Sequence, residues 1–508
     1  MVERIMKKFV KIKEIVECVI FLVIVLFLLC KVTWIFRANK TEAREDILGF
    51  KNEENIDVVL YGGSNLIQFY QPLEAWRQKG YTSYNYATSA AKGDLIKSYI
   101  EESRKTNKAK LYVCDIRSFP MIEEAVDEAS VRNWSDSVSM MSLVRVKGIS
   151  SFLFSRDWRD SDVPSFYFDI IKYHSNYELL ADPYQWSYTN SRNIINVDKG
   201  FEPNKVHLPF DRPEVSNERG TLTAQQEKAL SELLDYCDQE KLEVLFIVCP
   251  YIITEADCKV LNTCGDMIQK RGYTFINFNN YYDEIGLDFA TDFGDVNHVN
   301  YLGAEKYTTY LTNYISNNYD LPDHRSDPSF SDWDNDYAIF AESQKNWKEN
   351  AVLLTNQHFA AKEVGETLQK INEFADWFAA VQNENFTVII DKNQYYDFES
   401  EDTVFKSMIS KWGIDMTQTN YVGLWWGDNC IFSSNGDESF DGYIGFDGGR
   451  GATKCTVSSG INPQISVNEM DYFNDLEGIQ VIVFDNLYQK IIDNVSLRID
   501  ENGVELIR

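Results

Sequence analysis

The chain has 508 residues, enough for two or three domains, and carries a formal net charge of −29 at pH 7. An acidic balance of this size argues against nucleic acid or an anionic membrane surface as a main partner. The nine cysteines and five histidines form no Cys-x-x-Cys or His-x-x-x-His spacing, and no glycine-rich phosphate loop occurs. The sequence therefore predicts no metal site and no cofactor.

The amino-terminal region predicts a membrane anchor. Residues 1–14 are basic overall and predict a cytoplasmic tail, and residues 15–36 form an apolar run long enough to cross a bilayer. The alternative is a cleaved signal peptide, but the run continues into Trp34 and Phe36, which suit a membrane interface. We expect an uncleaved single-pass segment in the cell membrane, with the amino terminus inside and the bulk of the chain extracellular. The mostly polar residues 37–55 predict a stalk.

A strand followed by two glycines and a serine comes next. Residues 58–61 predict a short buried strand, Gly62 and Gly63 a sharp turn, and Leu66 the beginning of a helix. Such a turn presents its next side chain at the carboxyl edge of a sheet, where open α/β sheets bind their ligands. Ser64 is therefore a candidate nucleophile, with backbone N–H groups of the helix start as oxyanion donors. An ordinary glycine turn is the alternative.

Strands and helices alternate through this part of the chain, which predicts a parallel sheet with crossover helices. The alternation breaks over about residues 118–223, an aromatic, irregular insertion that we expect to act as a lid or acceptor-binding subdomain. Within it, His174 is either a second catalytic histidine or a structural one. Cys258 and Cys264 are spaced so that a local disulfide could form. Further strands are predicted at 84–87, 110–114, 244–249 and 273–278, a helix and loop at 67–80, and helices at 95–105, 223–239, 254–271 and 301–317.

A second chemical signal lies far along the chain. Asp295 stands three residues before His298, and a helix pattern starts at Tyr301. This spacing lets a carboxylate steady one imidazole nitrogen while the other faces a serine and takes its proton. The alternative is a surface loop whose Asp and His cap the following helix. Together with Ser64, the pair predicts a catalytic triad.

The strand–Gly–Ser start and the Asp-x-x-His end resemble the SGNH/GDSL hydrolase superfamily over about residues 55–318. The chain is most similar to its membrane-anchored, extracellular type in Gram-positive bacteria, which includes the D-alanyl transfer protein of teichoic acid modification. The resemblance implies an α/β fold with a three-layer α/β/α domain over residues 56–320. It also implies Ser64 as nucleophile, His298 as general base and Asp295 as the carboxylate that orients the base.

The same resemblance implies the oxyanion donors. The family's second block supplies a backbone donor, for which Gly93 is the matching residue. The third block normally offers an asparagine after a strand, whereas here the strand at 110–114 runs into residues 115–118 without one. We therefore consider Asn65 and Arg117 as sources of the second donor.

A separate carboxyl-terminal domain is predicted beyond a polar linker at 321–335. Residues 336–508 resemble the ILEI/PANDER-like domain, mainly through the Gly-Ile-x-Val-x-Val-x-Asp strand at 478–485 and the strand that returns at 490–500. The resemblance implies a β-rich α+β, lectin-like module. A long helix is expected at 357–380 and further strands at 386–390 and 421–426. Trp412, Trp425 and Trp426 are candidates for sugar stacking or for the core, and Asp428, Asp437, Asp441 and Asp447 form no regular calcium loop.

These patterns predict an extracellular, membrane-anchored serine acyltransferase or esterase. It would act on acetyl or D-alanyl groups of a cell-wall polymer or exopolysaccharide, with no cofactor. The resemblance implies a membrane-bound O-acyltransferase as a partner. The alternatives are a non-catalytic surface glycan-binding protein on a degenerate SGNH scaffold and a structural assembly factor for a wall-modifying complex.

Overall fold

The computed structural model divides the chain into two compact units. The first comprises Met1–Asn204, Pro213–Leu287 and His298–Trp347, and the second comprises Lys205–Arg212, Asp288–Asn297 and Lys348–Arg508. The structure describes residues 2–37, 42–123, 128–155, 163–181, 195–392, 403–418, 420–435, 438–445, 453–460, 463–474, 476, 478–500 and 503–508.

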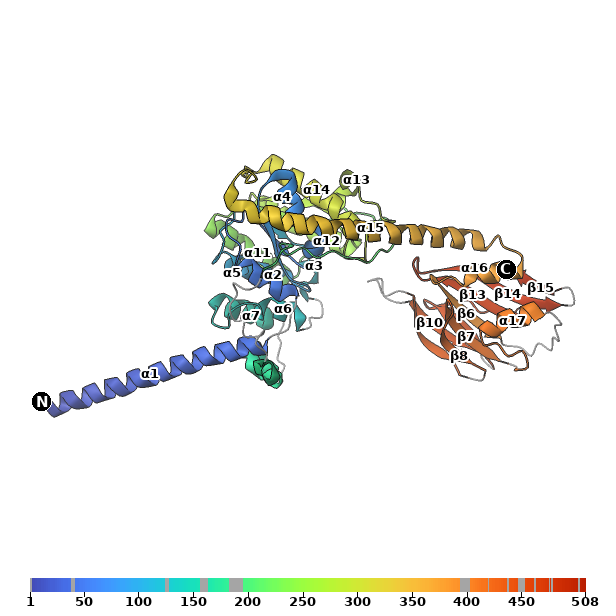
Figure 1. Ribbon diagram of the computed structural model, residues 1–508, viewed down its shortest axis with the longest axis horizontal. Helices are drawn as coiled ribbons and strands as arrows, with labels where there is room; N and C mark the ends of the chain where they lie inside the picture. The colour runs from blue at the N-terminus through green and yellow to red at the C-terminus, as the bar shows by residue number, and fades with distance from the viewer. Residues whose placement is uncertain are drawn as a thin grey trace. The chain divides into compact units, whose positions relative to one another are not determined.

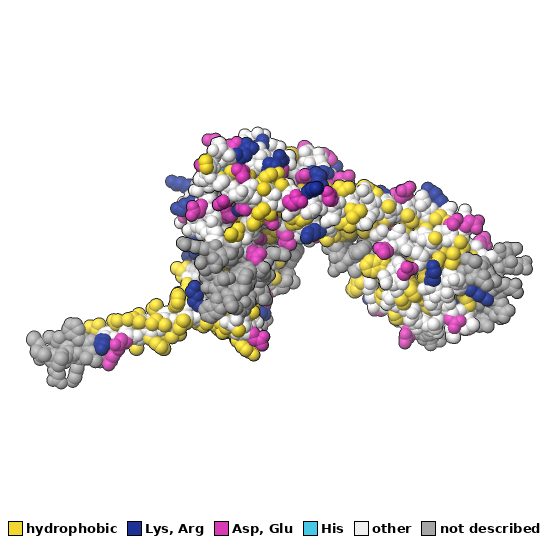
Figure 2. All heavy atoms as spheres, viewed as in Figure 1, with side chains coloured by type: hydrophobic (Ala, Val, Ile, Leu, Met, Phe, Trp, Pro, Cys, Tyr) yellow, Lys and Arg dark blue, Asp and Glu magenta, His cyan; other side chains and the backbone are white. Residues whose placement is uncertain are grey.

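The chain starts with a long helix, α1 (Val2–Phe36) (Figure 1). Its part from Ile12 to Phe36 is long and apolar enough to cross a membrane, although a signal sequence meets the same test. Hydrophobic side chains are exposed along it from Ile12 to Leu28 and form a yellow rod in Figure 2. Beyond Leu28 the first unit covers the helix, and Ile35 is only 1% exposed.

The predicted stalk is wrong, because residues 42–50 form a packed helix, α2 (Glu42–Phe50). Ile47, Leu48 and Phe50 are buried. The Phe50 ring lies 5.2 Å from that of Tyr84 and 5.0 Å from that of Tyr86. Because the segment is mostly polar, its composition did not indicate this apolar helix face, which covers one edge of the sheet.

The first unit is built on a parallel sheet of five strands in the order β2-β1-β3-β4-β5. The predicted strands are confirmed to within one or two residues. Their near-continuous apolar runs are typical of parallel strands that are buried on both faces. This order is one of the two common orders of doubly wound sheets, and its direction reverses between β1 and β3. The strands are β1 (Val58–Gly62), β2 (Ser83–Ala87), β3 (Leu111–Asp115), β4 (Val244–Val248) and β5 (Thr274–Asn277).

Helices connect and cover these strands (Figure 1). One group contains α14, which packs on α3 and α4, and another contains α5, which packs on α7 and α11. Helix α11 begins with a capping box, in which Thr223 and Gln226 satisfy each other's backbone N–H groups. The helices between strands are α3 (Ser64–Phe69), α4 (Pro72–Lys79), η1 (Gly93–Leu95), α5 (Ile96–Ser103), α11 (Ala224–Glu240), α12 (Glu255–Lys270), η5 (Phe278–Tyr281), α13 (Tyr282–Ile285) and α14 (Tyr301–Asn318).

The insertion predicted as irregular contains helices between Pro120 and Ala181, whereas its described residues 195–223 form no helix or strand. A buried ionic cluster organises it: Asp169 accepts a hydrogen bond from Arg37 Nε at 2.6 Å and another from Arg145 Nη2 at 2.8 Å. The three side chains are fully buried, so the end of α1 is fastened to α7 and α9. The elements are η2 (Pro120–Glu123), α6 (Ala129–Ser135), α7 (Leu143–Ser155), α8 (Val163–Tyr167), α9 (Asp169–Tyr173) and η3 (His174–Ala181).

The second unit contains two antiparallel sheets. One has six strands in the order β15-β14-β13-β6-β7-β8, and the other has four in the order β12-β11-β10-β9. Strand alternation gives each face of the larger sheet its own core. The strands are β6 (Phe386–Lys392), β7 (Tyr421–Trp426), β8 (Asn429–Ser434), β9 (Phe440–Ile444), β10 (Thr453–Ser458), β11 (Gln464–Val467), β12 (Met470–Asp471), β13 (Ile479–Asp485), β14 (Lys490–Asp500) and β15 (Gly503–Ile507).

The two cores use alternate residues of the same strands. Val388 and Ile390 of β6 join the core that includes helices α16 (Phe374–Val381) and α17 (Thr403–Lys411). Ile389, between them, joins the core shared with the four-stranded sheet. Burial on both faces explains why β13 is apolar from Val481 to Phe484.

The helix boundaries around the predicted linker are wrong. Residues 328–330 form the turn η6 (Pro328–Phe330), and α15 (Ser331–Leu368) follows directly, so the last part of the predicted linker is helical. The single helix predicted at 357–380 is divided between α15 and α16. Arg508 Nη2 donates to the carbonyl oxygens of Leu368 at 3.1 Å and Ile371 at 3.0 Å, which satisfies acceptors exposed where α15 ends.

Asp391 gives the second unit a testable dependence on pH. The side chain is 2% exposed, and burial raises the pKa of its carboxyl to about 7. As pH rises from about 4 to 7, the unfolded chain releases this proton while the folded chain holds it. The free energy of unfolding is therefore expected to fall by about 4 kcal/mol over that range.

Asp391→Asn is expected to remove most of this dependence and to stabilise the second unit at pH 7. Denaturant unfolding at pH 4.5 and 7.5 would measure both effects. Equal pH dependence in the wild type and the variant would contradict the assignment. Asp376→Asn, at an exposed position of α16, is the matched control and is expected to leave the pH dependence unchanged.

Candidate active site

The glycine–glycine–serine turn is a meeting point of three strand ends. A Cβ at Gly62 would lie 3.1 Å from Asp115 Cβ, and one at Gly63 would lie 3.9 Å from the carbonyl oxygen of Ala91. The turn after β1 therefore adjoins the end of β3 and the loop after β2. A Cβ at Gly62 would crowd Asp115, and one at Gly63 would lie 3.2 Å from Asn65 Oδ1. The two glycines avoid these close contacts and let the chain bring Ser64 into the first turn of α3.

Ser64 and His298 meet although 234 residues separate them. The distance from Ser64 Oγ to His298 Nε2 is 2.7 Å, and both side chains are half-buried. A hydroxyl and an imidazole nitrogen at this distance can share a hydrogen bond in which the serine proton moves to the ring. The structure thus brings together two of the three predicted catalytic residues.

The packing of α14 against α3 holds Ser64 and His298 close to each other. Thr308 of α14 accepts a hydrogen bond from the N–H of Gln71 at 3.0 Å and donates to the carbonyl oxygen of Phe69 at 3.1 Å. The rings of Phe69 and Tyr307 lie edge to face at 5.8 Å. His298 immediately precedes this helix, so these contacts hold it at the carboxyl edge of the sheet.

The alternative in which Asp295 and His298 merely cap the following helix is wrong. The cap is Asn300, whose side-chain oxygen accepts from the N–H groups of Leu302 at 3.0 Å and Gly303 at 3.3 Å. Asp295 instead accepts from the N–H of Asn297 at 2.7 Å. Asp295 belongs to the second compact unit, and its role as the carboxylate that orients His298 stays a prediction.

A buried carboxylate beside the nucleophile was not singled out by the sequence. Asp115, the last residue of β3, is 1% exposed and accepts a hydrogen bond from the side-chain amide of Asn65. Its other oxygen accepts from the N–H groups of Arg117 at 3.0 Å and Cys249 at 3.4 Å. Burial raises the pKa of Asp115, while these donors oppose the shift. Its place at the strand end next to the reversal of the sheet could have identified it.

The three predicted oxyanion donors differ in their surroundings. The side chain of Asn65 is held by Asp115, so its backbone N–H at the start of α3 is the better donor. The Arg117 guanidinium stacks 4.1 Å from the ring centroid of Tyr251. A Cβ at Gly93 would lie 2.6 Å from the Phe119 ring, so packing already requires a glycine there. The oxyanion roles of Gly93 and Arg117 stay predictions.

The other candidates lie in ordinary surroundings. His174 is exposed, and its Nδ1 lies 2.9 Å from the carbonyl oxygen of Ile171. All nine cysteines are described and carry free thiols, so Cys258 and Cys264 form no disulfide. Among the described residues, no group of three or more His, Cys, Asp or Glu side chains could hold a metal ion.

The candidate tryptophans and aspartates of the carboxyl-terminal domain differ in their burial and contacts. Trp412 is 1% exposed and lies in the core, with its ring 4.6 Å from that of Phe378, so the core alternative is confirmed for it. Trp425 is partly buried against the same core, whereas Trp426 is 38% exposed. Asp441 pairs with Lys454. Asp437 and Asp447 lie outside the described residues.

No protein-family model matches this chain, and no curated protein matches its sequence. The fold and the site by themselves define a protein with a parallel α/β unit, a serine–histidine pair at its sheet edge, an antiparallel β unit and an apolar amino-terminal helix.

Proposed function

We propose that this chain is an extracellular, membrane-anchored serine acyltransferase or esterase. The observation that carries the proposal is the 2.7 Å separation between Ser64 Oγ and His298 Nε2 at the carboxyl edge of a parallel sheet. Strand ends at a reversal of strand order are where such sheets bind ligands. A serine is a weak nucleophile until a base removes its proton, and His298 is placed to do so.

The chemistry follows from this pair. Ser64 Oγ attacks the carbonyl carbon of an acyl ester while His298 Nε2 takes the hydroxyl proton. The negative oxygen of the tetrahedral intermediate is stabilised by N–H donors such as the backbone of Asn65. His298 then returns the proton to the departing alcohol, leaving an acylated Ser64. A second hydroxyl, from a glycan or from water, repeats these steps in reverse and carries the acyl group away.

The family resemblance suggests the substrates. The acyl group would be acetyl or D-alanyl, and the acceptor a hydroxyl of a wall polymer or exopolysaccharide. A membrane-bound O-acyltransferase would deliver the acyl group to the outer side of the membrane. Helix α1 supports anchoring there because its exposed side chains from Val19 to Leu28 are apolar and its segment Ile12–Phe36 is apolar enough to cross a membrane.

The full-length chain in neutral detergent, supplied with 4-nitrophenyl acetate, tests the proposal. We expect acetate release that Ser64→Ala lowers by about 10³-fold or more. With a polysaccharide acceptor present, mass spectrometry would distinguish transfer from hydrolysis. Release that is equally fast in Ser64→Ala would contradict the proposal. Ser89→Ala, at an exposed serine of the loop after β2, is a matched control that should leave the rate unchanged.

A second candidate is a non-catalytic glycan-binding protein. The observation that favours it is the exposure of two aromatic side chains of the second unit, Trp426 at 38% and Tyr443 at 66%, since exposed aromatic faces can stack on sugars. Glycan retention that is lost in Trp426→Ala, in a chain whose Ser64 does not react with acyl esters, would favour this candidate over the first.

A further inference from the structure

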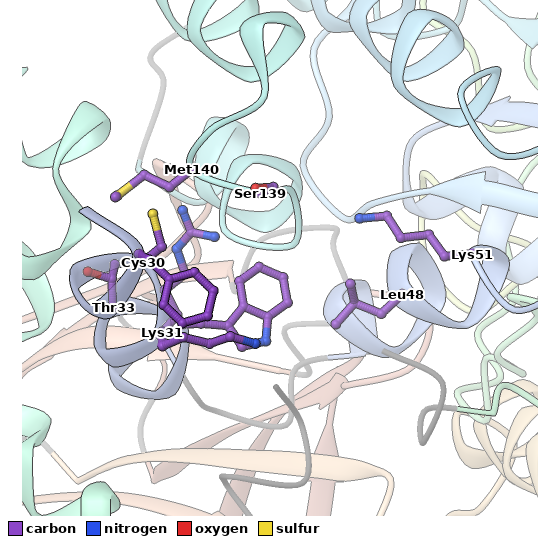
Figure 3. Close-up of a pocket in the computed structure, with 10 residues that line it drawn as sticks. Cys30, Lys31, Thr33, Leu48, Lys51, Ser139 and Met140 are labelled. Atoms are coloured by element: carbon purple, nitrogen blue, oxygen red, sulfur yellow. The ribbon is translucent and has the colours of Figure 1, made fainter. Parts of the chain in front are cut away.

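A cavity lies between the last turns of α1, the end of α2 and the loop between α6 and α7 (Figure 3). Its volume is about 240 Å³. Helix α1 contributes Phe27, Lys31 and Trp34, the end of α2 contributes Leu48 and Lys51, and the loop between α6 and α7 contributes Met140. In Figure 3, Lys51 extends into the cavity from the side opposite Met140. The lining thus combines two amines with apolar and aromatic groups.

We propose that this cavity binds the phosphate-bearing headgroup of an anionic membrane phospholipid. The inference rests on the anchoring part of the proposed function, in which α1 crosses the membrane. It does not depend on the chemistry of Ser64.

The position of the cavity along α1 is the first argument. The exposed stretch from Ile12 to Leu28 is apolar except for Lys13, Glu14 and Glu17 near its start. It rises by about 26 Å at 1.5 Å per residue, close to the ~30 Å hydrocarbon core of a bilayer. Lys31, one turn beyond its end, would therefore lie among the headgroups. Trp34 follows, and tryptophan is enriched at that level.

The state of the two lysines is the second argument. Among the described residues, neither Lys31 nor Lys51 forms an ion pair. Burial lowers the pKa of Lys51, although the charge of Glu102 opposes the shift. Glu102 itself is bound to Lys105 at 2.5 Å and accepts from Ser142 at 2.8 Å. A half-buried amine without a counter-ion is stabilised by an anion, and juxtamembrane basic pockets bind anionic lipid headgroups.

The third cation that lines the cavity, Arg37, already binds other groups of the protein. Arg37 donates to Asp169 and to the carbonyl oxygen of Val138 at 2.7 Å, so it shapes the cavity wall and leaves recognition to the lysines. The volume is below the ~300–1,000 Å³ of drug-sized sites, which suits a headgroup but not a whole lipid. The acyl chains would lie along the apolar side of α1.

Exposed apolar side chains next to the cavity complete the arrangement. Met141 and Leu143, which follow the lining residue Met140, are 65% and 75% exposed. Such residues would be favourable at the lipid level around a bound headgroup. The net charge of −29 opposes general adhesion to an anionic surface, so recognition would be confined to this cavity.

Native mass spectrometry of the full-length chain in neutral detergent tests the proposal. Phosphatidylglycerol and phosphatidylcholine with the same acyl chains would be titrated separately. We expect one retained phosphatidylglycerol per chain and weaker retention of phosphatidylcholine. Lys31→Gln or Lys51→Gln should lower phosphatidylglycerol affinity about 5-fold, and the double variant about 30-fold. Lys51→Arg should preserve affinity because it preserves the charge.

Two control variants distinguish binding in this cavity from nonspecific adhesion of lipid to the chain. Lys147→Gln, at an exposed lysine of α7, should bind like the wild type, as should Ser64→Ala. Equal retention of the two lipids, or equal losses in Lys147→Gln and Lys51→Gln, would overturn the proposal. Displacement of phosphatidylglycerol by 10 mM inorganic phosphate would overturn it in favour of a free-phosphate site. Extraction of the chain from membranes by alkaline carbonate would show instead that the anchoring premise is wrong.

Discussion

Replacing His298 with alanine is expected to slow acylation of Ser64 by about 10²–10⁴-fold, the usual contribution of a positioned general base. In the structure His298 Nε2 is 2.7 Å from Ser64 Oγ, so without the ring the hydroxyl must lose its proton to water. His298 is half-buried and precedes α14, so its removal should leave the core intact. The burst of 4-nitrophenol from the full-length chain would measure the acylation rate.

His174→Ala is the matched control for this prediction. His174 is exposed, and its ring nitrogen lies near the Ile171 carbonyl oxygen rather than near Ser64. We expect wild-type acylation in this variant. A rate that falls equally in both variants, or in neither, would show that the Ser64–His298 contact has no catalytic role.

Replacing Asp169 with alanine is expected to lower the free energy of unfolding of the first unit by about 3–5 kcal/mol. The substitution would leave the buried guanidinium groups of Arg37 and Arg145 without their shared carboxylate, which now lies 2.6 Å and 2.8 Å from them. Removing one partner of a fully buried ion pair is costly because the remaining charge stays desolvated. Denaturant unfolding in neutral detergent, followed by tryptophan fluorescence, would measure the change.

A surface ion pair offers the comparison. Asp235 pairs with Arg271 at 2.6 Å, but their side chains are 65% and 39% exposed. Asp235→Ala is therefore expected to cost less than about 1 kcal/mol. If both variants lost the same stability, the cluster at Asp169 would not be what fastens α1 to the insertion.

Much of the sheet could be predicted because its strands are short apolar runs bounded by polar or glycine-containing turns. The strands that begin at Val58, Leu111 and Val244 follow this pattern, and β13 does so in the second unit. The Ser64–His298 contact was also predictable, since strand ends of a parallel sheet meet at one edge. The positions of the two motifs in the sequence were therefore enough to predict that Ser64 and His298 act together.

What could not be predicted depends on tertiary contacts. The apolar face of α2 consists of a few residues within a polar segment, and its burial follows only from packing near Tyr84. The helices of the insertion are organised by Asp169, whose partners are 132 and 24 residues away in the chain. In the sequence Asp115 is only a polar residue at the end of a strand. The structure shows in addition that it accepts a hydrogen bond from Asn65, the residue after the nucleophile.

The most direct test of the central claim is covalent labelling of the full-length chain by a fluorophosphonate, followed by peptide mapping. The full chain is needed because truncation at residue 41 would remove Arg37 and leave Asp169 without one of its partners. We expect one adduct, on Ser64 Oγ, absent in Ser64→Ala and strongly reduced in His298→Ala. A folded chain whose Ser64 stays unmodified, or labelling that persists in Ser64→Ala, would contradict the account.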